Sequence, residues 1–210
     1  MKRILLTSEN AGEVLADVEE VIRRGGIVIV STDTVYGIVG DAPSVHAIEK
    51  AFSIKQRPEE KAFPVFIGSI PDARRWAYVS DQKAAFLEHV WPGAITVVFQ
   101  KKGELPALLS GGKDTLGLRM PDHPFLLRLL SFFDFPLFQT SANISSQEPA
   151  RTPEDVLRYF GEDNSTIDLF IDAGPLIGNS STVIDFTHDH PIILRSGRVS
   201  KAELDRLLGL

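Results

Sequence analysis

The sequence predicts an α/β fold in which helices flank a mixed β-sheet, folded as a single domain over residues 1–210. Apolar runs of strand length occur along the whole chain, and segments of helical periodicity lie between many of them. With 210 residues, 43% of them hydrophobic, the chain is long enough to bury one sizeable core. Because the last third holds several short strands close together, a mixed sheet is favoured over a doubly wound parallel sheet.

Strands are assigned to short apolar runs such as "GIVIV" and "AITVVF", and helices to longer stretches of amphipathic periodicity. The motif "WPG" ends a helix just before a strand, and Thr152 and Ser200 supply N-cap hydroxyls at two helix starts. Gly37 is expected to form a turn. In chain order we expect strand 3–6, helix 11–24, strand 26–30, helix 43–54, strand 63–67, helix 81–90, strand 94–99, strand 115–120, helix 124–132, strand 136–140, helix 153–160, strands 168–172, 181–186 and 192–195, and helix 200–208.

Composition excludes several classes of chemistry. The chain contains no cysteine, which excludes disulfides, thiolate catalysis, iron–sulfur clusters and cysteine-ligated zinc. The formal charge of -6 argues against a broadly basic nucleic-acid surface, although it permits a local cationic cleft. The sequence shows no apolar run of about 18 residues for a membrane span and no signal peptide. We therefore expect a cytoplasmic protein with no membrane contact.

The motif "KQRPEEK" concentrates Lys55, Arg57 and Lys61 within one loop, and Pro58 forces the chain out of helix there. Such a cation cluster suits a ligand that carries several phosphates. The alternative is a solvated loop in which the neighbouring glutamates neutralise the charge. The motif alone leaves both interpretations open.

Three clusters of hydroxyl side chains stand at strand ends. They are "STDT" from residue 31, "TSANISS" from residue 140 and "SST" from residue 180. Such groups bind phosphate oxygens or hold the waters of a magnesium ion. They also serve as N-caps and turn formers, which is the more frequent use of a single cluster. Their recurrence in one chain favours a binding site.

Two arginines, Arg119 and Arg195, each stand at a strand end before a turn. An arginine in that place pairs a carboxylate or phosphate of a ligand, or pairs a surface acid. Phosphate-binding glycine loops, the nucleophile elbow and the H-E-x-x-H zinc motif are missing, and the five histidines show no clear ligand spacing.

Seven blocks together resemble the YrdC family in order and spacing: "STDTVYGIVGDA", "IKQRPEEK", "WPGAITVVF", "LGLRMPDHP", "TSANISSQEPA", "STVIDF" and "ILRSGRVS". The resemblance implies a YrdC-like fold, a twisted mixed sheet that encloses a large cleft. It implies synthesis of threonylcarbamoyl-AMP and pyrophosphate from L-threonine, bicarbonate and ATP with Mg²⁺. The product would feed N6-threonylcarbamoyladenosine formation at position 37 of tRNA by a partner transferase complex. The extra C-terminal domain of longer relatives is expected to be absent.

The resemblance also implies roles for individual residues. Lys55 and Arg57 are expected to be catalytic. The expected ATP contacts are Lys55, Arg57, Thr115, Ser141, Asn143, Arg151 and Arg195. The expected threonine contacts are Thr32, Thr34, Arg119 and Ser181, and the expected rim of the site is Tyr36, Lys61 and Thr182. No protein side chain is assigned to the metal.

Two other functions were weighed. An RNA-binding module for double-stranded RNA or tRNA would use the same cations, but the acidic net charge and the lack of a basic stretch interleaved with aromatics favour a small nucleotide. The carbamoyl-transfer relative of hydrogenase maturation needs cysteines and extra length that the chain lacks.

Overall fold

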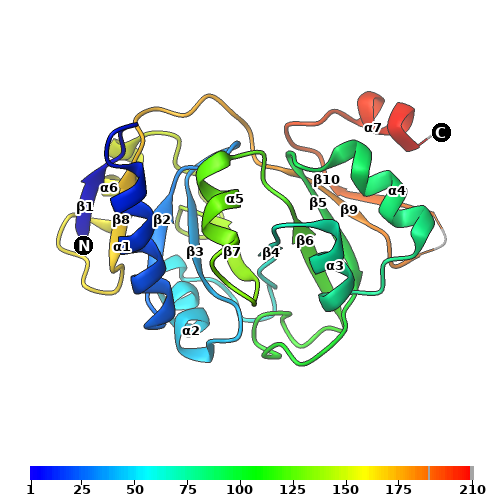
Figure 1. Cartoon of the computed structure of the whole chain (residues 1–210), viewed down its shortest axis with the longest axis horizontal. Helices are drawn as coiled ribbons and strands as arrows, with labels where there is room; N and C mark the ends of the chain where they lie inside the picture. Colours follow the sequence, from blue (N-terminus) through cyan, green and yellow to red (C-terminus); the bar gives the residue numbers. More distant parts are fainter. Residues whose placement is uncertain (189, 209–210) are drawn as a thin grey trace.

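The computed structural model describes residues 1–188 and 190–208, which form one ten-stranded sheet with helices packed around it (Figure 1). The strands are β1 (Lys2–Leu5), β2 (Ile27–Val30), β3 (Gly37–Asp41), β4 (Val65–Phe66), β5 (Ile95–Gln100), β6 (Thr115–Arg119), β7 (Leu137–Ser141), β8 (Leu169–Asp172), β9 (Thr182–Asp185) and β10 (Ile192–Arg195). The helices are α1 (Ala11–Arg23), α2 (Val45–Lys55), α3 (Ile70–Trp76), α4 (Asp81–Val90), α5 (Pro124–Leu130), α6 (Pro153–Phe160) and α7 (Lys201–Leu208).

The sheet is mixed, as the sequence predicted. Its strand order is β1-β8-β2-β3-β7-β4-β6-β5-β9-β10. The pairs β1–β8, β2–β8, β4–β6 and β5–β9 are parallel, and the other neighbouring pairs are antiparallel. The order brings strands from both halves of the sequence together at the middle of the sheet, so one site there draws on distant segments.

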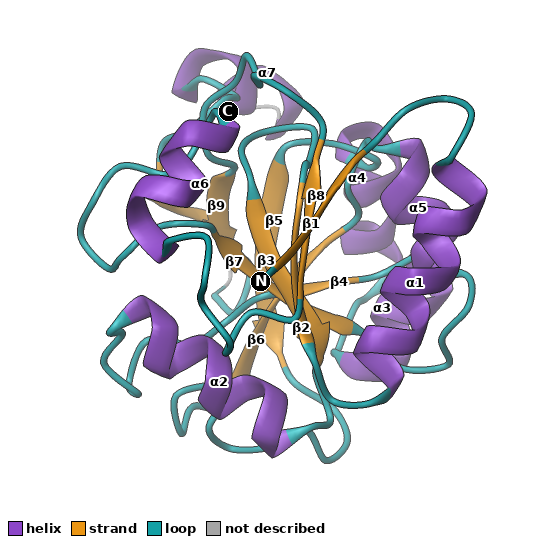
Figure 2. Ribbon diagram, turned by 90° about the vertical axis from the view of Figure 1, so that its left-hand side faces the viewer, coloured by secondary structure: helices purple, strands orange, loops and turns teal. Residues whose placement is uncertain are grey.

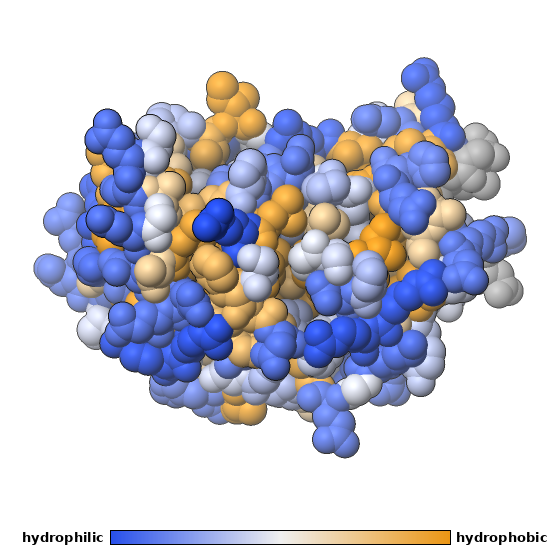
Figure 3. Space-filling view, in the orientation of Figure 1, coloured by the Kyte–Doolittle hydropathy of each residue, from blue (hydrophilic) through white to orange (hydrophobic). Residues whose placement is uncertain are grey.

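Helices cover both sides of the sheet: α1, α3, α4 and α5 lie on one side in Figure 2, and α2 and α6 lie on the other. The amphipathic helix α1 buries Val14, Val18 and Ile22, which belong to the same apolar cluster as Val28 and Val30 of β2. Apolar side chains also gather near the centre of the face drawn in Figure 3, over α5. No helix in the described residues is long and apolar enough to span a bilayer.

Two elements differ from the sequence prediction. Gly37 does not form a turn; it begins β3, which pairs with β2 and β7, and the turn lies in the preceding segment 31–36. The chain "GIVGD" carries two glycines, which hides its strand character from a propensity argument. The helix α3 was not predicted; it is only seven residues long, and the side chain of its N-cap, Ser69, accepts from Asp72 N.

The strand β4 is short, and the residue before it, Pro64, accepts a hydrogen bond from Gln139 N of β7 at 2.8 Å. The strand has only two residues, and its neighbours β6 and β7 continue beyond it. Ala62 and Pro64 line a cavity at this position, whereas Phe63 between them is buried in the core.

Candidate active site

A cavity of about 550 Å³, here called the central cavity, lies against one face of β3, β7, β6, β5 and β9. Residues on this face follow the two-residue period of a strand. Val98 of β5 is paired with Gly117 of β6 on one side and with Asp185 of β9 on the other, and all three line the cavity. Thr115 and Arg119 flank Gly117 on the same face, so β6 presents polar residues to the cavity.

The segment 31–36 is wound around the hydroxyl of Thr32. Thr32 Oγ1 donates to Val35 O at 2.7 Å and accepts from Thr34 N at 3.0 Å and Val35 N at 3.2 Å. Because its single proton is used on Val35 O, Thr34 Oγ1 must donate in the 2.8 Å contact between the two hydroxyls. Both threonines line the central cavity, but the Thr32 hydroxyl is engaged in building the turn.

Replacing Thr32 by valine is expected to lower the free energy of unfolding by about 1–3 kcal/mol, because a buried carbonyl and two amide groups lose their partner. Urea unfolding of the variant measures this loss. Ser131→Ala removes a hydroxyl from an exposed position and serves as the control. Equal stability of Thr32→Val and wild type would contradict the assignment of Thr32 as the centre of the turn.

Arg119 enters the cavity from the end of β6 with its guanidinium already bound on three sides. Nε donates to Gly93 O at 3.0 Å, Nη1 donates to Thr34 Oγ1 at 3.2 Å, and Nη2 donates to Asp33 Oδ1 at 2.6 Å. Burial lowers the pKa of the Arg119 guanidinium, and the Asp33 carboxylate opposes that effect. Arg119 was expected to bind the carboxylate of threonine, but one of its N–H groups already binds the Asp33 carboxylate.

Ser181 and Arg195 lie together in the cavity wall next to Thr96 of β5. Arg195 donates from Nη2 to Ser181 O at 2.9 Å and to Ser181 Oγ at 3.2 Å, and Thr96 Oγ1 lies 3.0 Å from Ser181 Oγ. The arginine therefore orients the serine, while both residues line the cavity. Thr96 was not foreseen as a site residue, because it stands inside a run that reads as an ordinary buried strand.

Arg57 gives the cavity an unneutralised cation. Its Nε and Nη2 donate to Lys61 O at 3.0 Å and to Ala62 O at 2.9 Å, and its guanidinium lies 5.1 Å from the centre of the Phe63 ring. Burial, together with the charge of Arg195, lowers the pKa of Arg57. Within the described residues, none of the cavity cations Arg57, Lys113 and Arg195 forms an ion pair.

Lys55 lies behind the cavity wall rather than on it. The side chain is 1% exposed, and Nζ donates to Ser141 O at 2.6 Å, Asn143 O at 2.9 Å and Asn143 Oδ1 at 3.1 Å. Asn143 in turn donates to Ile144 O and Gln147 O, both at 2.8 Å, so it also lies in the loop scaffold. Of this group, Ser141 lines the cavity.

Of the remaining predicted site residues, some line the central cavity and some lie outside it. Thr115 and Tyr36 line it, and the Tyr36 hydroxyl donates to Gly174 O at 2.7 Å. Burial raises the pKa of Tyr36 to about 12. Lys61 and Arg151 are exposed and do not line the cavity; Arg151 bonds the side chain of Asn179.

Thr182 was expected at the rim and lies instead in the interior. It is fully buried, donates from Oγ1 to Val199 O at 2.7 Å and accepts from Gly197 N at 3.0 Å. The period of two explains the difference, because its neighbours Ser181 and Val183 are the residues of this segment that line the cavity.

Several lining residues were missed by sequence reasoning. Gln139, Lys113 and Asp185 line the cavity and were not foreseen, whereas Thr140 and Ser180, which also line it, belong to the hydroxyl clusters identified in the sequence. A signal existed for two of them: the strand "TVID" alternates with Asp185 on the face of Val183, and "LFQTS" alternates with Gln139 on the face of Ser141. No sequence signal identified Lys113, which stands after two glycines with positive φ in an irregular loop.

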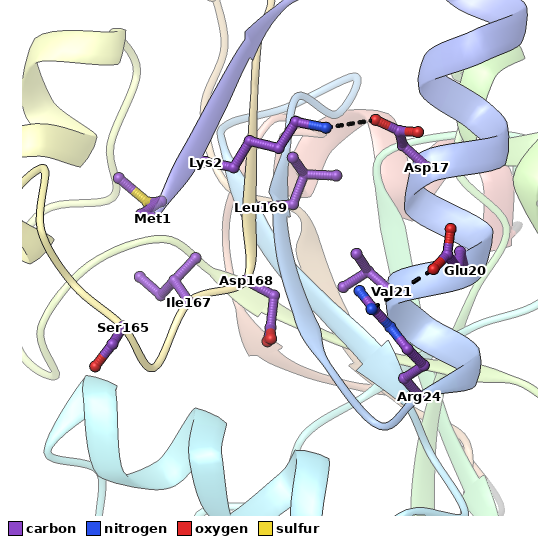
Figure 4. Close-up of a pocket in the computed structure, with 10 residues that line it drawn as sticks. All are labelled: Met1, Lys2, Asp17, Glu20, Val21, Arg24, Ser165, Ile167, Asp168 and Leu169. Carbon is purple, nitrogen blue, oxygen red and sulfur yellow. Dashed lines mark hydrogen bonds and ion pairs between the residues drawn. The ribbon is translucent and has the colours of Figure 1, made fainter.

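A second cavity of about 450 Å³ lies near the N-terminus, between α1 and strands β1 and β8 (Figure 4). Its charges are matched within the chain: Lys2 pairs with Asp17 at 2.9 Å, and Arg24 lies 3.5 Å from Glu20. Asp168 is paired with Lys50 at 2.7 Å. Because these charges are already neutralised, the central cavity is the stronger candidate for an anionic ligand.

The fold and the central cavity define an α/β protein with a polar, cation-lined pocket built on a mixed sheet. A family model for the Sua5, YciO and YrdC proteins, described as "Telomere recombination", matches residues 20–197. The chain therefore belongs to the Sua5/YciO/YrdC family, as its motifs indicated.

Relatives and solved structures agree with this assignment. The threonylcarbamoyl-AMP synthase of Pyrococcus abyssi is 33% identical over 191 residues, which are 90% of this chain and 55% of the relative. A putative threonylcarbamoyl-AMP synthase of Methanocaldococcus jannaschii is 33% identical over 202 residues, 96% of this chain and 94% of the relative. The chain also spans only 56% of the Bacillus subtilis synthase.

Among solved structures, P. abyssi Sua5 complexed with L-threonine superposes with a TM-score of 0.90 at 30% identity, covering 99% of this chain and 60% of that one. E. coli YciO superposes with a TM-score of 0.82 at 25% identity, covering 93% of this chain and 94% of that one. These similarities confirm the YrdC-like fold.

Proposed function

We propose that the chain is an enzyme, a nucleotidyltransferase that makes threonylcarbamoyl-AMP and pyrophosphate from L-threonine, bicarbonate and ATP. The observation that carries the proposal is the polarity of the central cavity. The cavity holds the cations Arg57 and Arg195, which have no carboxylate partner within the described residues, together with Arg119 and the threonine hydroxyls. Relatives named threonylcarbamoyl-AMP synthase and a structure of Sua5 with L-threonine support it.

The chemistry suits a site that lacks an activated nucleophile. The neutral amine of L-threonine attacks carbon dioxide formed from bicarbonate, and the nitrogen loses a proton as the C–N bond forms. An oxygen of the resulting N-carboxylate attacks the α-phosphorus, and the bond to the bridging oxygen breaks as pyrophosphate leaves with the electron pair. The protein aligns the reactants and balances the phosphate charge with Arg57 and Arg195.

Magnesium is proposed to enter with ATP. Asp185 is the one carboxylate that lines the cavity in the described part of the chain, and no group of three or more metal-binding side chains occurs there. Mg²⁺ in nucleotide sites is usually held by one or two carboxylates together with substrate phosphates, so this donor set fits. Asp185 would hold the ion, which would neutralise negative charge on the leaving pyrophosphate.

Pyrophosphate release is expected only when ATP, L-threonine and bicarbonate are all present. The experiment measures release with each substrate withheld in turn, and with L-valine in place of L-threonine as the matched control. Release that continues without threonine or without bicarbonate would contradict the proposed reaction.

The partners follow from the product. Threonylcarbamoyl-AMP is a mixed anhydride whose acyl group must pass to an amine, and we propose that a transferase complex passes it to adenosine 37 of tRNA. tRNA would then be the later acceptor rather than a ligand of the central cavity. The cytoplasm, which holds tRNA, is the proposed location.

A further inference from the structure

Asp33 and Arg119 form an unusual ion pair. Their side chains are 9% and 3% exposed, and within the described residues no other ion pair has both members less than a tenth exposed. Arg119 lines the central cavity, whereas Asp33 does not. Asp33 therefore contacts the arginine from behind the cavity wall.

Stability alone does not explain such a pair. The cost of removing two charges from water often equals or exceeds their mutual attraction, and apolar residues of similar volume frequently serve as well. What an ion pair adds here is geometry, because a guanidinium is planar and its donors are fixed relative to one another. Nε bonds Gly93 O, Nη1 bonds Thr34 Oγ1 and Nη2 bonds Asp33 Oδ1, so the plane is set by three separate partners.

Those three bonds leave two N–H groups of Arg119 for a ligand. A guanidinium has five N–H groups, so one on Nη1 and one on Nη2 have no hydrogen-bond partner within the described residues. Each of these N–H groups can donate a charge-assisted hydrogen bond to a carboxylate oxygen. Of the three partners, Asp33 is the one that carries a charge and makes the shortest bond.

Asp33 itself is held on both sides. Its carbonyl oxygen accepts a hydrogen bond from Arg198 Nη1, and its backbone lies in the turn that is built around the Thr32 hydroxyl. Arg195 and Arg198 are close enough to act on Arg119 as like charges. Without the Asp33 carboxylate, the guanidinium would face these two cations with no balancing charge and would keep only its bonds to Gly93 O and Thr34 Oγ1.

We propose that Asp33 is the positioning residue for the amino acid substrate: its carboxylate fixes the plane of Arg119 so that the two remaining N–H groups take the substrate carboxylate. This inference rests on the proposed function and deepens it. Asp33 acts through Arg119 and has no contact with the cavity, so its loss affects recognition of the amino acid rather than of the nucleotide.

The test replaces Asp33 by asparagine, which keeps the shape and one acceptor but removes the charge. L-Threonine and ATP are titrated separately into the full chain by calorimetry, and KM and kcat for each are measured by pyrophosphate release. We expect Kd and KM for threonine to rise by about 10- to 100-fold, the range seen when an outer partner of a binding group is removed. Kd for ATP and kcat are expected to stay within about twofold, which a general loss of structure would not produce.

Asp168→Asn is the matched control, because it removes an aspartate from another ion pair, with Lys50 at 2.7 Å, remote from the cavity. A double-mutant cycle adds Arg119→Lys. If Asp33 acts through Arg119, then Asp33→Asn has no further effect on threonine binding in the Arg119→Lys background. Additive effects would overturn the proposal.

Asp33→Glu keeps the charge and covers the case in which Asp33→Asn does not fold. Its carboxylate lies one methylene further out and displaces the guanidinium, so we expect a several-fold rise in Kd for threonine with ATP binding unchanged. Unchanged threonine affinity in this variant overturns the inference. If wild type itself binds no threonine, the proposed function is the part that fails.

Discussion

Replacing Arg57 by alanine is expected to lower kcat with ATP by about 10²-fold or more, which is the usual effect of removing one preorganised group from a developing charge. Arg57 is held by Lys61 O and Ala62 O and lies against Phe63, so the guanidinium is fixed before the ligand arrives. It lines the central cavity and forms no ion pair in the described part of the chain. Steady-state pyrophosphate release at saturating threonine measures the loss.

Two arginines outside the central cavity serve as controls for Arg57→Ala. Arg158 is exposed on α6 and pairs with Asp155 at 2.8 Å, so Arg158→Ala should leave kcat unchanged. Arg151 was predicted from the resemblance as an ATP contact but does not line the cavity, so its replacement should cost much less than that of Arg57. Equal losses for Arg57→Ala and Arg151→Ala would show that the cavity alone does not define the nucleotide site.

Much of the fold was predictable because its strands are short apolar runs with clear breaks. The apolar runs at residues 26–30 and 94–99 form the strands β2 and β5, and Thr152 is the N-cap of α6 as expected. The strand β3 was not predicted, because glycine lowers strand propensity. Its position is set by its pairing with β2 and β7, of which β7 is distant in the sequence. Strand order is likewise set by contacts between distant segments, which periodicity does not report.

The motifs named part of the cavity lining but not its geometry, and Lys55, Asn143 and Thr182, named in the same way, do not line it. Thr34, Arg119, Ser181 and Arg195 were named from the motifs, and the structure brings them to one cavity. The role of Asp33 was not apparent, because nothing in "STDT" says which side chain points into the cavity and which points behind it. That distinction depends on how the Thr32 hydroxyl winds the turn.

Replacing Lys55 by methionine is expected to lower kcat by about 10²-fold, because a displacement of about 1 Å in a positioned group has that effect. Nζ donates to oxygens of Ser141 and Asn143, and Ser141 lines the central cavity. Loss of these bonds frees the end of β7 at Ser141 and the loop that follows it. Lys50→Met is the control on the same helix, since Lys50 pairs with Asp168 at a site away from the cavity.

The same lysine gives stability a characteristic pH dependence. Burial, with a smaller effect from the charge of Arg57, lowers the pKa of Lys55 to about 7. In the unfolded chain the pKa of lysine is about 10.4, so between these values the unfolded state holds a proton that the native state has lost. The contribution of Lys55 to the free energy of unfolding therefore rises with pH between the two pKa values, by up to about 1.4 kcal/mol per pH unit.

Urea unfolding of wild type and Lys55→Met at pH 7, 8 and 9 isolates this contribution, because every other titrating group is common to both proteins. We expect the stability of wild type relative to Lys55→Met to increase from pH 7 to pH 9. A constant difference would mean that the native lysine keeps its proton throughout, held by the three oxygen acceptors around Nζ. In that case the hydrogen bonds of the ammonium outweigh its burial cost, and a fixed charge holds the end of β7 and the following loop at every pH tested.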